Sequence, residues 1–409
     1  MKETKKIHCF FNAPYLGGAE RSFINQATDL KKISLEKNLD YEFNFIIPFF
    51  KYPGEDKSLE ELILSKGFRR QQILYFAYHS TFYSLGRSQL EKGPLSLFFL
   101  FLKIPLLIYS YLWSVQSLNR LNKTDADIWW IGGNKIGPLV FFLSFFKAYK
   151  GRLIWHFRDY LSLKDLFSWC WKFFSFFSSC SLEFIGNSYD VSRSIKKALP
   201  AKAKSWTLYN PVGEISYSPS ASQKDKNFIL STASMFAPWK GIHFLVQFAC
   251  LFEKSLKEIG ISEFHIYGDE IYKTTGDHFG YKDQLNAILK KYKCDFVKFK
   301  GLKSPSHIFS NSDLFIHSSL RPEPFGRVVV ESYRSGTPLI STALGGAGEL
   351  IEENISALTF LPYDYHGLLS CIETACSQER FSLIQKGRAK GDSIEQEYYT
   401  QLDAIFIFS

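Results

Sequence analysis

The stretch that decides the fold is "DLFIHSSLRPEPFGRVVVESYRSGTPLIST", residues 313–342. Residues 313–319 and 338–342 are short apolar runs of strand length. Between them, residues 325–336 have the pattern of a helix that ends at Gly336. Two buried strands joined by a helix form a parallel strand–helix–strand unit, so this stretch predicts an α/β fold.

The same alternation of short apolar runs and longer helical stretches continues along the chain. The runs are rich in β-branched and aromatic residues, which is typical of buried parallel strands. The sequence therefore predicts two Rossmann-like, doubly wound α/β domains. The first has strands at 6–11, 43–49, 73–77, 127–133, 152–157 and 183–188, and the second at 227–234, 263–269, 297–301, 313–319, 338–342 and 357–360.

The chain length and one loop-rich segment place the domain boundary. A chain of 409 residues is too long for one ordinary core and suits two domains. Pro, Ser and Gly gather in residues 208–227, so we expect domains at 1–210 and 211–409, with the last helix a candidate to pack back on the first. Parallel sheets bind ligands beyond the carboxyl ends of their strands, so we expect the site in a cleft between the two domains.

The aromatic content is high for a globular chain. Aromatic residues make up 17% of the sequence, with 40 Phe and 22 Tyr, more than two ordinary cores need, so part of them is expected on an apolar surface. Residues 95–113 are nearly long enough to span a bilayer but contain Lys103 and Pro105, which favours a buried or membrane-surface helix. Residues 166–177 are expected to contact a membrane interface.

Charge and cysteine usage limit the partners and the compartment. Residues 1–210 hold 29 Lys and Arg against 17 Asp and Glu, and the remainder holds 20 against 23. A basic first half suits an anionic membrane or a nucleic acid, or reflects solubility alone. Seven scattered cysteines without a Cys-x-x-Cys pair indicate a reducing compartment and no zinc site. The N-terminus lacks a signal-peptide pattern, so a cytoplasmic location is expected.

Two loops after predicted strands carry groups that suit a phosphate. Gly17 and Gly18 lie between a strand and a helix, where bare backbone N–H groups at a helix N-terminus attract anions, although such a glycine pair is often only a tight turn. Lys240 opens a helix after another strand and is either a site cation or an ordinary exposed lysine. Each signal is weak when taken alone.

Two carboxylates in the opening stretch give a more specific signal. Glu323 follows a strand, and Glu331 lies eight residues later, at most about 12 Å along a helix. Carboxylates at this separation can accept hydroxyl hydrogen bonds from a sugar and a ribose while the helix N-terminus at Phe325 and Gly326 faces a diphosphate. A plain amphipathic helix is the alternative, but it has no need of Glu331 within "VVVESY".

With these motifs in order, the sequence resembles retaining glycosyltransferases of the GT-B fold, the large family 4 group. The resemblance covers nearly the whole chain through "GGAE" (17–20), "HFRD" (156–159), "GNS" (186–188), "YNPV" (209–212), "WKG" (239–241), "YGD" (267–269), "FKG" (299–301), "EPFGRVVVE" (323–331) and "SGTPLISTALGGAGELI" (335–351).

The resemblance implies a role for each matched residue. Glu323 would hold donor-sugar hydroxyls, Glu331 the ribose, and Lys240 the diphosphate, while His156 would face the reacting centre near the acceptor. It also implies an acceptor-binding first domain and a nucleotide-sugar-binding second domain. Catalytic residues would be His156, Glu323 and Lys240, and the donor would contact Gly17, Gly18, Lys240, Gly301, Glu323, Phe325, Gly326, Arg327, Glu331, Gly345 and Gly346.

One departure from the family pattern leaves alternative functions open. Family members usually carry an arginine where this chain has Ser234 or Met235, so Arg327 or Arg158 would have to replace it. The alternatives are an epimerase or phosphorylase of the same fold, and a donor-binding relic with impaired catalysis. No metal and no cofactor is expected besides the nucleotide-sugar donor, because lysine and helix dipoles can stabilise a departing diphosphate. The expected partners are a nucleotide sugar, a glycan or lipid-linked acceptor and an anionic membrane surface on the inner face, and no nucleic acid.

Overall fold

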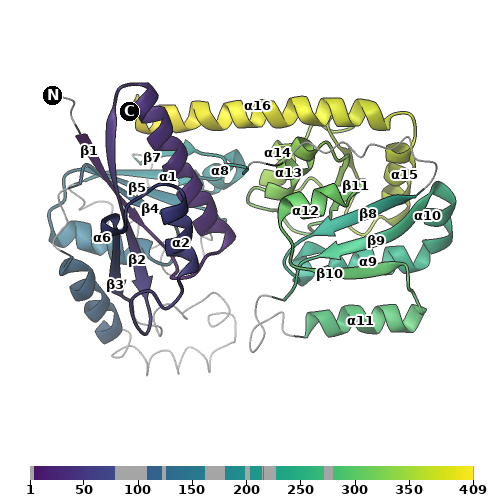
Figure 1. Ribbon diagram of the computed structural model, residues 1–409, viewed down its shortest axis with the longest axis horizontal. Helices are drawn as coiled ribbons and strands as arrows, with labels where there is room; N and C mark the ends of the chain where they lie inside the picture. The colour runs from purple at the N-terminus through teal and green to yellow at the C-terminus, as the bar shows by residue number, and fades with distance from the viewer. Residues whose placement is uncertain are drawn as a thin grey trace. The chain divides into compact units, whose positions relative to one another are not determined.

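The computed structural model describes residues 4–78, 108–121, 126–161, 180–198, 203–213, 215, 227–270 and 280–408. It contains two compact units (Figure 1), which are described separately. The first unit comprises Met1–Pro211 with Tyr399–Ser409, and the second comprises Val212–Tyr398. The sequence predicts the boundary after residue 210 and makes the last helix a candidate to pack back on the first domain.

The first unit is built on a parallel sheet of seven strands in the order β3-β2-β1-β4-β5-β6-β7. Six of the strands follow the predicted runs, and β7 was missed because its residues are exposed or half-buried at the sheet edge. The strands are β1 (Thr4–Phe10), β2 (Asp40–Phe49), β3 (Ile73–Ala77), β4 (Ile128–Ile131), β5 (Arg152–Phe157), β6 (Ser181–Gly186) and β7 (Lys204–Thr207).

The helices of the first unit pack against a core that is rich in aromatic side chains. Trp129 and Trp130 of β4 and Trp155 of β5 are all fully buried, so part of the aromatic excess fills this core. The helices are α1 (Gly18–Glu36), α2 (Ser58–Ser65), η1 (Arg70–Gln72), α6 (Gly137–Phe146) and α8 (Tyr189–Ala198), with residues 108–119 also helical and the end of α16 (Arg380–Phe406) joining the unit.

The second unit repeats the same plan with six parallel strands in the order β10-β9-β8-β11-β12-β13. All six follow predicted runs. They are β8 (Phe228–Ala233), β9 (Ile261–Tyr267), β10 (Val297–Gly301), β11 (Leu314–His317), β12 (Leu339–Ser341) and β13 (Leu358–Thr359). The prediction of two doubly wound parallel α/β folds is confirmed.

Helices cover both faces of the second sheet, with α9 and α11 on one side and α12 and α13 on the other (Figure 1). Apolar residues of α9, such as Phe244 and Phe248, are fully buried in the core beneath the strands. The helical elements are η2 (Pro238–Lys240), α9 (Ile242–Leu251), α10 (Glu253–Ile259), α11 (Tyr281–Tyr292), α12 (Pro305–Ser310), α13 (Arg327–Ser335), α14 (Gly346–Glu349), α15 (Tyr365–Cys376) and most of α16.

The two apolar segments singled out in the sequence are largely outside the described residues. All of 166–177 and residues 95–107 belong to that group, whereas residues 108–113 are described and helical. Within the described ranges, no helix combines the length and the apolar character that crossing a membrane requires.

Candidate functional site

The strand order of the second unit points to one place for a ligand. Strands β8 and β11 are neighbours, but the chain leaves β8 toward β9 on one side and leaves β11 toward β12 on the other. Ligands of open parallel sheets bind beyond the strand ends where the order reverses in this way. The loop after β8 carries Lys240, and the segment after β11 carries Glu323, so both lie at this point.

Hydrogen bonds hold these two segments together. The Ser318 hydroxyl donates to the Lys240 carbonyl at 2.9 Å, and the Leu320 N–H donates to the Trp239 carbonyl at 2.8 Å. Gly241 has a φ of 75°, and a Cβ there would lie 2.3 Å from the Ser318 carbonyl oxygen, so the close approach requires glycine. This packing fixes Lys240 at the end of the sheet.

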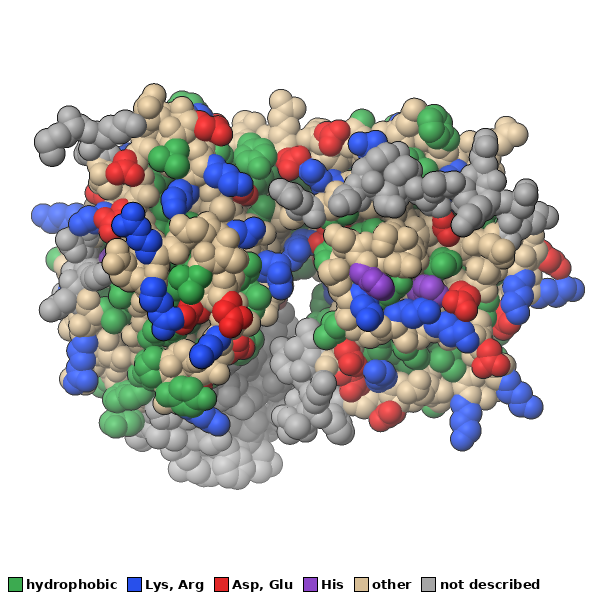
Figure 2. Space-filling model, viewed as in Figure 1, with side chains coloured by type: hydrophobic (Ala, Val, Ile, Leu, Met, Phe, Trp, Pro, Cys, Tyr) green, Lys and Arg blue, Asp and Glu red, His purple; other side chains and the backbone are tan. Residues whose placement is uncertain are grey.

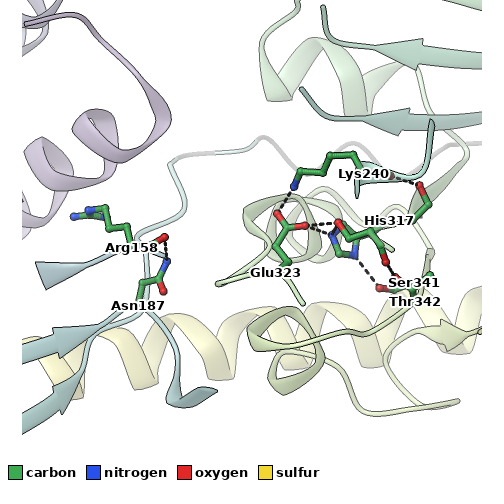
Figure 3. Close-up of polar contacts among 9 residues, drawn as sticks. Arg158, Asn187, Lys240, His317, Glu323, Ser341 and Thr342 are labelled. Atoms are coloured by element: carbon green, nitrogen blue, oxygen red, sulfur yellow. Dashed lines mark hydrogen bonds and ion pairs between the residues drawn. The ribbon is translucent and has the colours of Figure 1, made fainter. Parts of the chain in front are cut away.

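The Glu323 carboxylate is the centre of a side-chain cluster (Figure 3). Lys240 Nζ lies 2.5 Å from Oε1, while Oε2 accepts hydrogen bonds from His317 Nε2 at 2.8 Å and from Ser319 Oγ at 2.5 Å. Ser341 Oγ lies 3.0 Å from the other ring nitrogen, His317 Nδ1. The Lys240 and Glu323 side chains are only 14% and 13% exposed, so this cluster is well shielded from water.

The cluster keeps Glu323 ionised. Burial raises the pKa of this carboxyl, but the charge of Lys240 and the interaction with His317 outweigh burial, and the pKa of Glu323 lies well below its usual range. Together, the paired Lys240 and Glu323 side chains carry little net charge.

Helix α13 presents the second carboxylate, Glu331, in a different environment. Glu331 is 5% exposed, and Arg327 Nη2 donates to its Oε1 at 3.0 Å. Burial raises the pKa of Glu331, and Arg327 offsets that rise only in part. The helix begins after Gly326, whose φ is 83° and whose added Cβ would lie 2.8 Å from the Ala347 Cβ. The predicted helix with its N-terminus beside Phe325 and Gly326 is therefore present.

The predicted glycine loop at Gly345 and Gly346 lies beside Glu323. The Glu323 N–H donates to the Leu344 carbonyl at 3.1 Å, and Glu323 forms an isolated parallel bridge with Gly345. Gly301 lies at the end of β10, where its carbonyl accepts from the Gly268 N–H at 2.9 Å. Gly301 thus ends one strand, and the loop at Gly345 and Gly346 follows the carboxyl end of another strand in the same sheet.

The position of the missing arginine is half-buried. Ser234 follows β8, and its Oγ is buried with no hydrogen-bond partner among the described residues. Met235 is also half-buried. Arg327 lies in the same unit, but its guanidinium is engaged with Glu331.

In the first unit, the loop at Gly17 and Gly18 leads into α1 as predicted, but an internal carboxylate lies at the helix N-terminus. Glu20 is 7% exposed. Burial raises the pKa of Glu20, while hydrogen bonds from the backbone N–H groups of Glu20 and Gly17 and the charge of Arg158 lower it. A phosphate at this turn would have to compete with Glu20, so the role of Gly17 and Gly18 in donor binding stays a prediction.

The structure places His156 inside β5, fully buried, with its ring parallel to Trp130 at 6.4 Å between centroids. Burial, and then the charge of Arg158, holds the pKa of His156 well below its usual value, so the imidazole is neutral. Its Nε2 is buried without a hydrogen-bond partner among the described residues. The predicted catalytic role of His156 stays a prediction.

Arg158 is the centre of a polar network that the sequence did not reveal. Its guanidinium donates to Asn210 Oδ1 and to Gln26 Oε1, each at 2.6 Å, and Asn187 Nδ2 lies 3.5 Å from its carbonyl (Figure 3). Gln26 in turn donates to the Tyr209 carbonyl at 3.1 Å. These contacts occupy the guanidinium of Arg158, one of the two candidates to replace the missing phosphate-binding arginine.

Solved structures match the chain over nearly its whole length. The Anabaena protein HepE in complex with UDP and glucose has a TM-score of 0.69 and 21% identity, and the match covers 98% of this chain and 99% of that one. The pneumococcal O-GlcNAc transferase GtfA in complex with UDP and GlcNAc has a TM-score of 0.65 and 15% identity, with 98% and 99% covered. The chain has the GT-B glycosyltransferase fold.

A family model and several curated relatives match part of the chain. Residues 215–390 match the family model described as "Glycosyl transferases group 1". The GtfA subunit of a UDP-N-acetylglucosamine–peptide N-acetylglucosaminyltransferase from Streptococcus parasanguinis is 29% identical over 47% of this chain and 32% of its own length. The putative glycosyltransferase YtcC from Bacillus subtilis is 27% identical over 39% and 38%. The chain thus spans about a third of the length of these curated relatives.

Proposed function

We propose that the protein is a glycosyltransferase of family 4 that moves a hexosyl-type sugar from a nucleotide diphosphate sugar to a hydroxyl group, with retention at the anomeric carbon. The observation that carries this proposal is the cluster of Lys240, Glu323 and His317 at the point where the strand order of the second unit reverses. The family-model match over residues 215–390 supports it. The complexes of HepE and GtfA suggest UDP as the first nucleotide to test.

The proposed reaction assigns a task to each charged group of the second unit. Lys240 and the N-terminus of α13 stabilise the diphosphate as its bond to the anomeric carbon breaks. The acceptor hydroxyl attacks on the face that the diphosphate leaves, and its proton passes to the departing phosphate oxygen. Glu323 accepts sugar hydroxyls and Glu331 accepts ribose hydroxyls. These groups need no metal, and His156 is proposed to lie near the acceptor.

Binding and transfer with a panel of nucleotide sugars test this proposal. We expect UDP-glucose or UDP-N-acetylglucosamine to raise the melting temperature, since a ligand that binds only the folded state stabilises it. Release of UDP should depend on a hydroxyl acceptor, and product NMR should show the anomeric configuration of the donor. Donor binding without any transfer would support the relic, and an altered free sugar or nucleotide sugar would support the epimerase or phosphorylase. No binding of any nucleotide sugar would refute the proposal.

We further propose that the acceptor is lipid-linked or a cell-surface glycan, and that the first unit docks on the anionic inner face of a membrane. Residues 108–119 form a helix that exposes Ile108, Tyr109 and Leu112 by 53–61% while Ser110 and Ser114 are buried. Leu118 of this helix is buried in the core, whereas the exposed apolar side chains near its start suit contact with a membrane interface. Lys and Arg side chains are spread over the first unit, at the left of Figure 2, among acidic ones.

Liposome flotation tests the membrane proposal. Binding should require anionic lipid and should be reduced but not abolished by high salt, because charge attraction is screened while inserted side chains are not. Replacing Ile108 and Leu112 by Ser should weaken the salt-resistant binding by on the order of tenfold. The matched control replaces Ile355 and Leu361, exposed residues of the second unit, by Ser. Equal binding to neutral lipid, or equal loss in the control, would contradict membrane docking.

A further inference from the structure

His317 is the part of the Glu323 cluster to which the family resemblance assigns no role. It ends β11 and is 5% exposed, and both ring nitrogens have partners. Nδ1 lies 3.0 Å from Ser341 Oγ at the end of β12, and Nε2 lies 2.8 Å from Glu323 Oε2. The imidazole therefore bridges the end of the neighbouring strand and the candidate sugar-binding carboxylate.

The direction of these hydrogen bonds follows from the groups that can donate. An ionised carboxylate only accepts, so His317 Nε2 carries the proton that is directed at Glu323. The Ala343 N–H donates to Ser341 Oγ at 3.0 Å. With a neutral imidazole, Nδ1 is an acceptor, and the Ser341 hydroxyl donates to it. The hydrogen bonds then run from the Ala343 backbone through Ser341 and His317 to Glu323, which orients the ring.

The two oxygens of Glu323 are held by groups of different mobility. Oε2 is bonded to His317 and Ser319, both buried and both at the end of β11. Oε1 is bonded to Lys240, whose ammonium ends a flexible four-carbon stem. A bound diphosphate would compete for Lys240 but offers nothing to the imidazole at Oε2.

We propose that His317 is a positioning residue that fixes Oε2 of Glu323, so that Oε1 is the oxygen that accepts a hydroxyl of the donor sugar when Lys240 turns to the diphosphate. This inference rests on the proposed function, since it assumes that Glu323 binds the sugar. It adds that recognition of the sugar depends on an imidazole that does not itself contact the donor. Binding of UDP, which has no sugar to be recognised by Glu323, should not need His317.

The test compares UDP, UDP-glucose and UDP-N-acetylglucosamine on His317→Leu, His317→Gln and the unmodified protein by calorimetry. His317→Leu removes one of the two donors to Oε2 and leaves only Ser319 there, whereas Gln keeps an N–H at a similar distance from the backbone. We expect His317→Leu to weaken binding of the UDP-sugar by about tenfold or more, with UDP binding changed less than about twofold. His317→Gln should recover most of the loss. His307→Leu, on an exposed position of α12, is the matched control.

Each other outcome overturns the inference in a recognisable way. If His317→Leu binds the UDP-sugar as the unmodified protein does, His317 does not position Glu323, although the proposed function stands. If UDP and UDP-sugar are weakened equally, or if Gln fails together with Leu, His317 only supports the fold. If the unmodified protein binds none of the three probes, the proposed function fails and the inference falls with it.

Discussion

Glu323→Gln is expected to reduce sugar transfer by at least about 100-fold and also to destabilise the second unit. The variant loses the charged acceptor for the donor sugar. It also loses the ion pair that sets the position of Lys240. A Gln amide accepts at only one of the two positions, so its NH2 group would face either Lys240 or both His317 and Ser319. Breaking a shielded ion pair of this kind costs about 3 kcal/mol.

The stability effect of Glu323 has a defined pH dependence. The folded-state pKa of Glu323 is below the value of an unfolded chain, which is about 4.3. The contribution is therefore fully present above about pH 4.3 and is lost as the pH falls toward the folded-state pKa. Melting temperatures from pH 3 to 8 should show a difference between wild type and variant that is constant at neutral pH and shrinks in acid.

The matched control is Glu258→Gln, which removes an exposed carboxylate 3.9 Å from Lys254. Exposed ion pairs contribute little, so this change should leave both transfer and melting temperature nearly unaltered. A Glu323→Gln variant that melts and transfers sugar like the Glu258 variant would show that the cluster is neither a ligand site nor a support of the fold.

The sequence predicts the position of those site residues that follow a strand. Lys240 and Glu323 follow apolar runs that were recognised as buried parallel strands, and parallel strands bring their carboxyl ends to one edge. The partners of Glu323 were not predicted, because which side chains meet depends on strand order and on rotamers. The run "HSS" (317–319) after a buried strand was the available signal, since polar residues there are at the same sheet edge.

The first unit shows a different reason for a missed feature. His156 belongs to a predicted strand, but its complete burial against Trp130 depends on which helices cover the sheet. The "GGAE" pattern predicted a helix N-terminus that is open to an anion, yet Glu20 of the same pattern lies there in the structure. A carboxylate three residues into a helix can occupy the position that a phosphate would take.

Glu331 provides a contrasting prediction, because its environment disfavours its charge. Its pKa is raised by burial in the folded state, and Arg327 compensates only in part. Because the pKa is raised in the folded state, the contribution of the Glu331 carboxyl to the free energy of unfolding is largest below the unfolded-chain pKa of about 4.3. This contribution is lost as the pH rises through the folded-state pKa. The Glu331 carboxyl therefore lowers the stability of the fold at neutral pH, a cost that a role in ligand binding would explain.

The ion pair between Arg327 and Glu331 is not placed where it would stabilise helix α13. Arg327 is the first residue of α13, where the helix dipole disfavours a cation. An arginine placed N-terminal to its acidic partner is also the weaker orientation of an i,i+4 pair. The arginine instead limits the cost of a buried carboxylate, and its own side chain is 27% exposed, so it can be hydrated when the partner is removed.

Glu331→Gln is accordingly expected to raise the melting temperature at neutral pH while weakening donor binding by roughly 10- to 150-fold through the lost ribose acceptor. The gain in melting temperature should vanish below about pH 4, where wild type is protonated as well. Arg327→Leu should have the opposite effect on stability, because it leaves Glu331 without its counter-charge. In the double variant this penalty should disappear, and a double-mutant cycle measures the coupling. A Glu331→Gln protein that melts lower than wild type, or that binds UDP-sugar unchanged, would contradict this account of the second carboxylate.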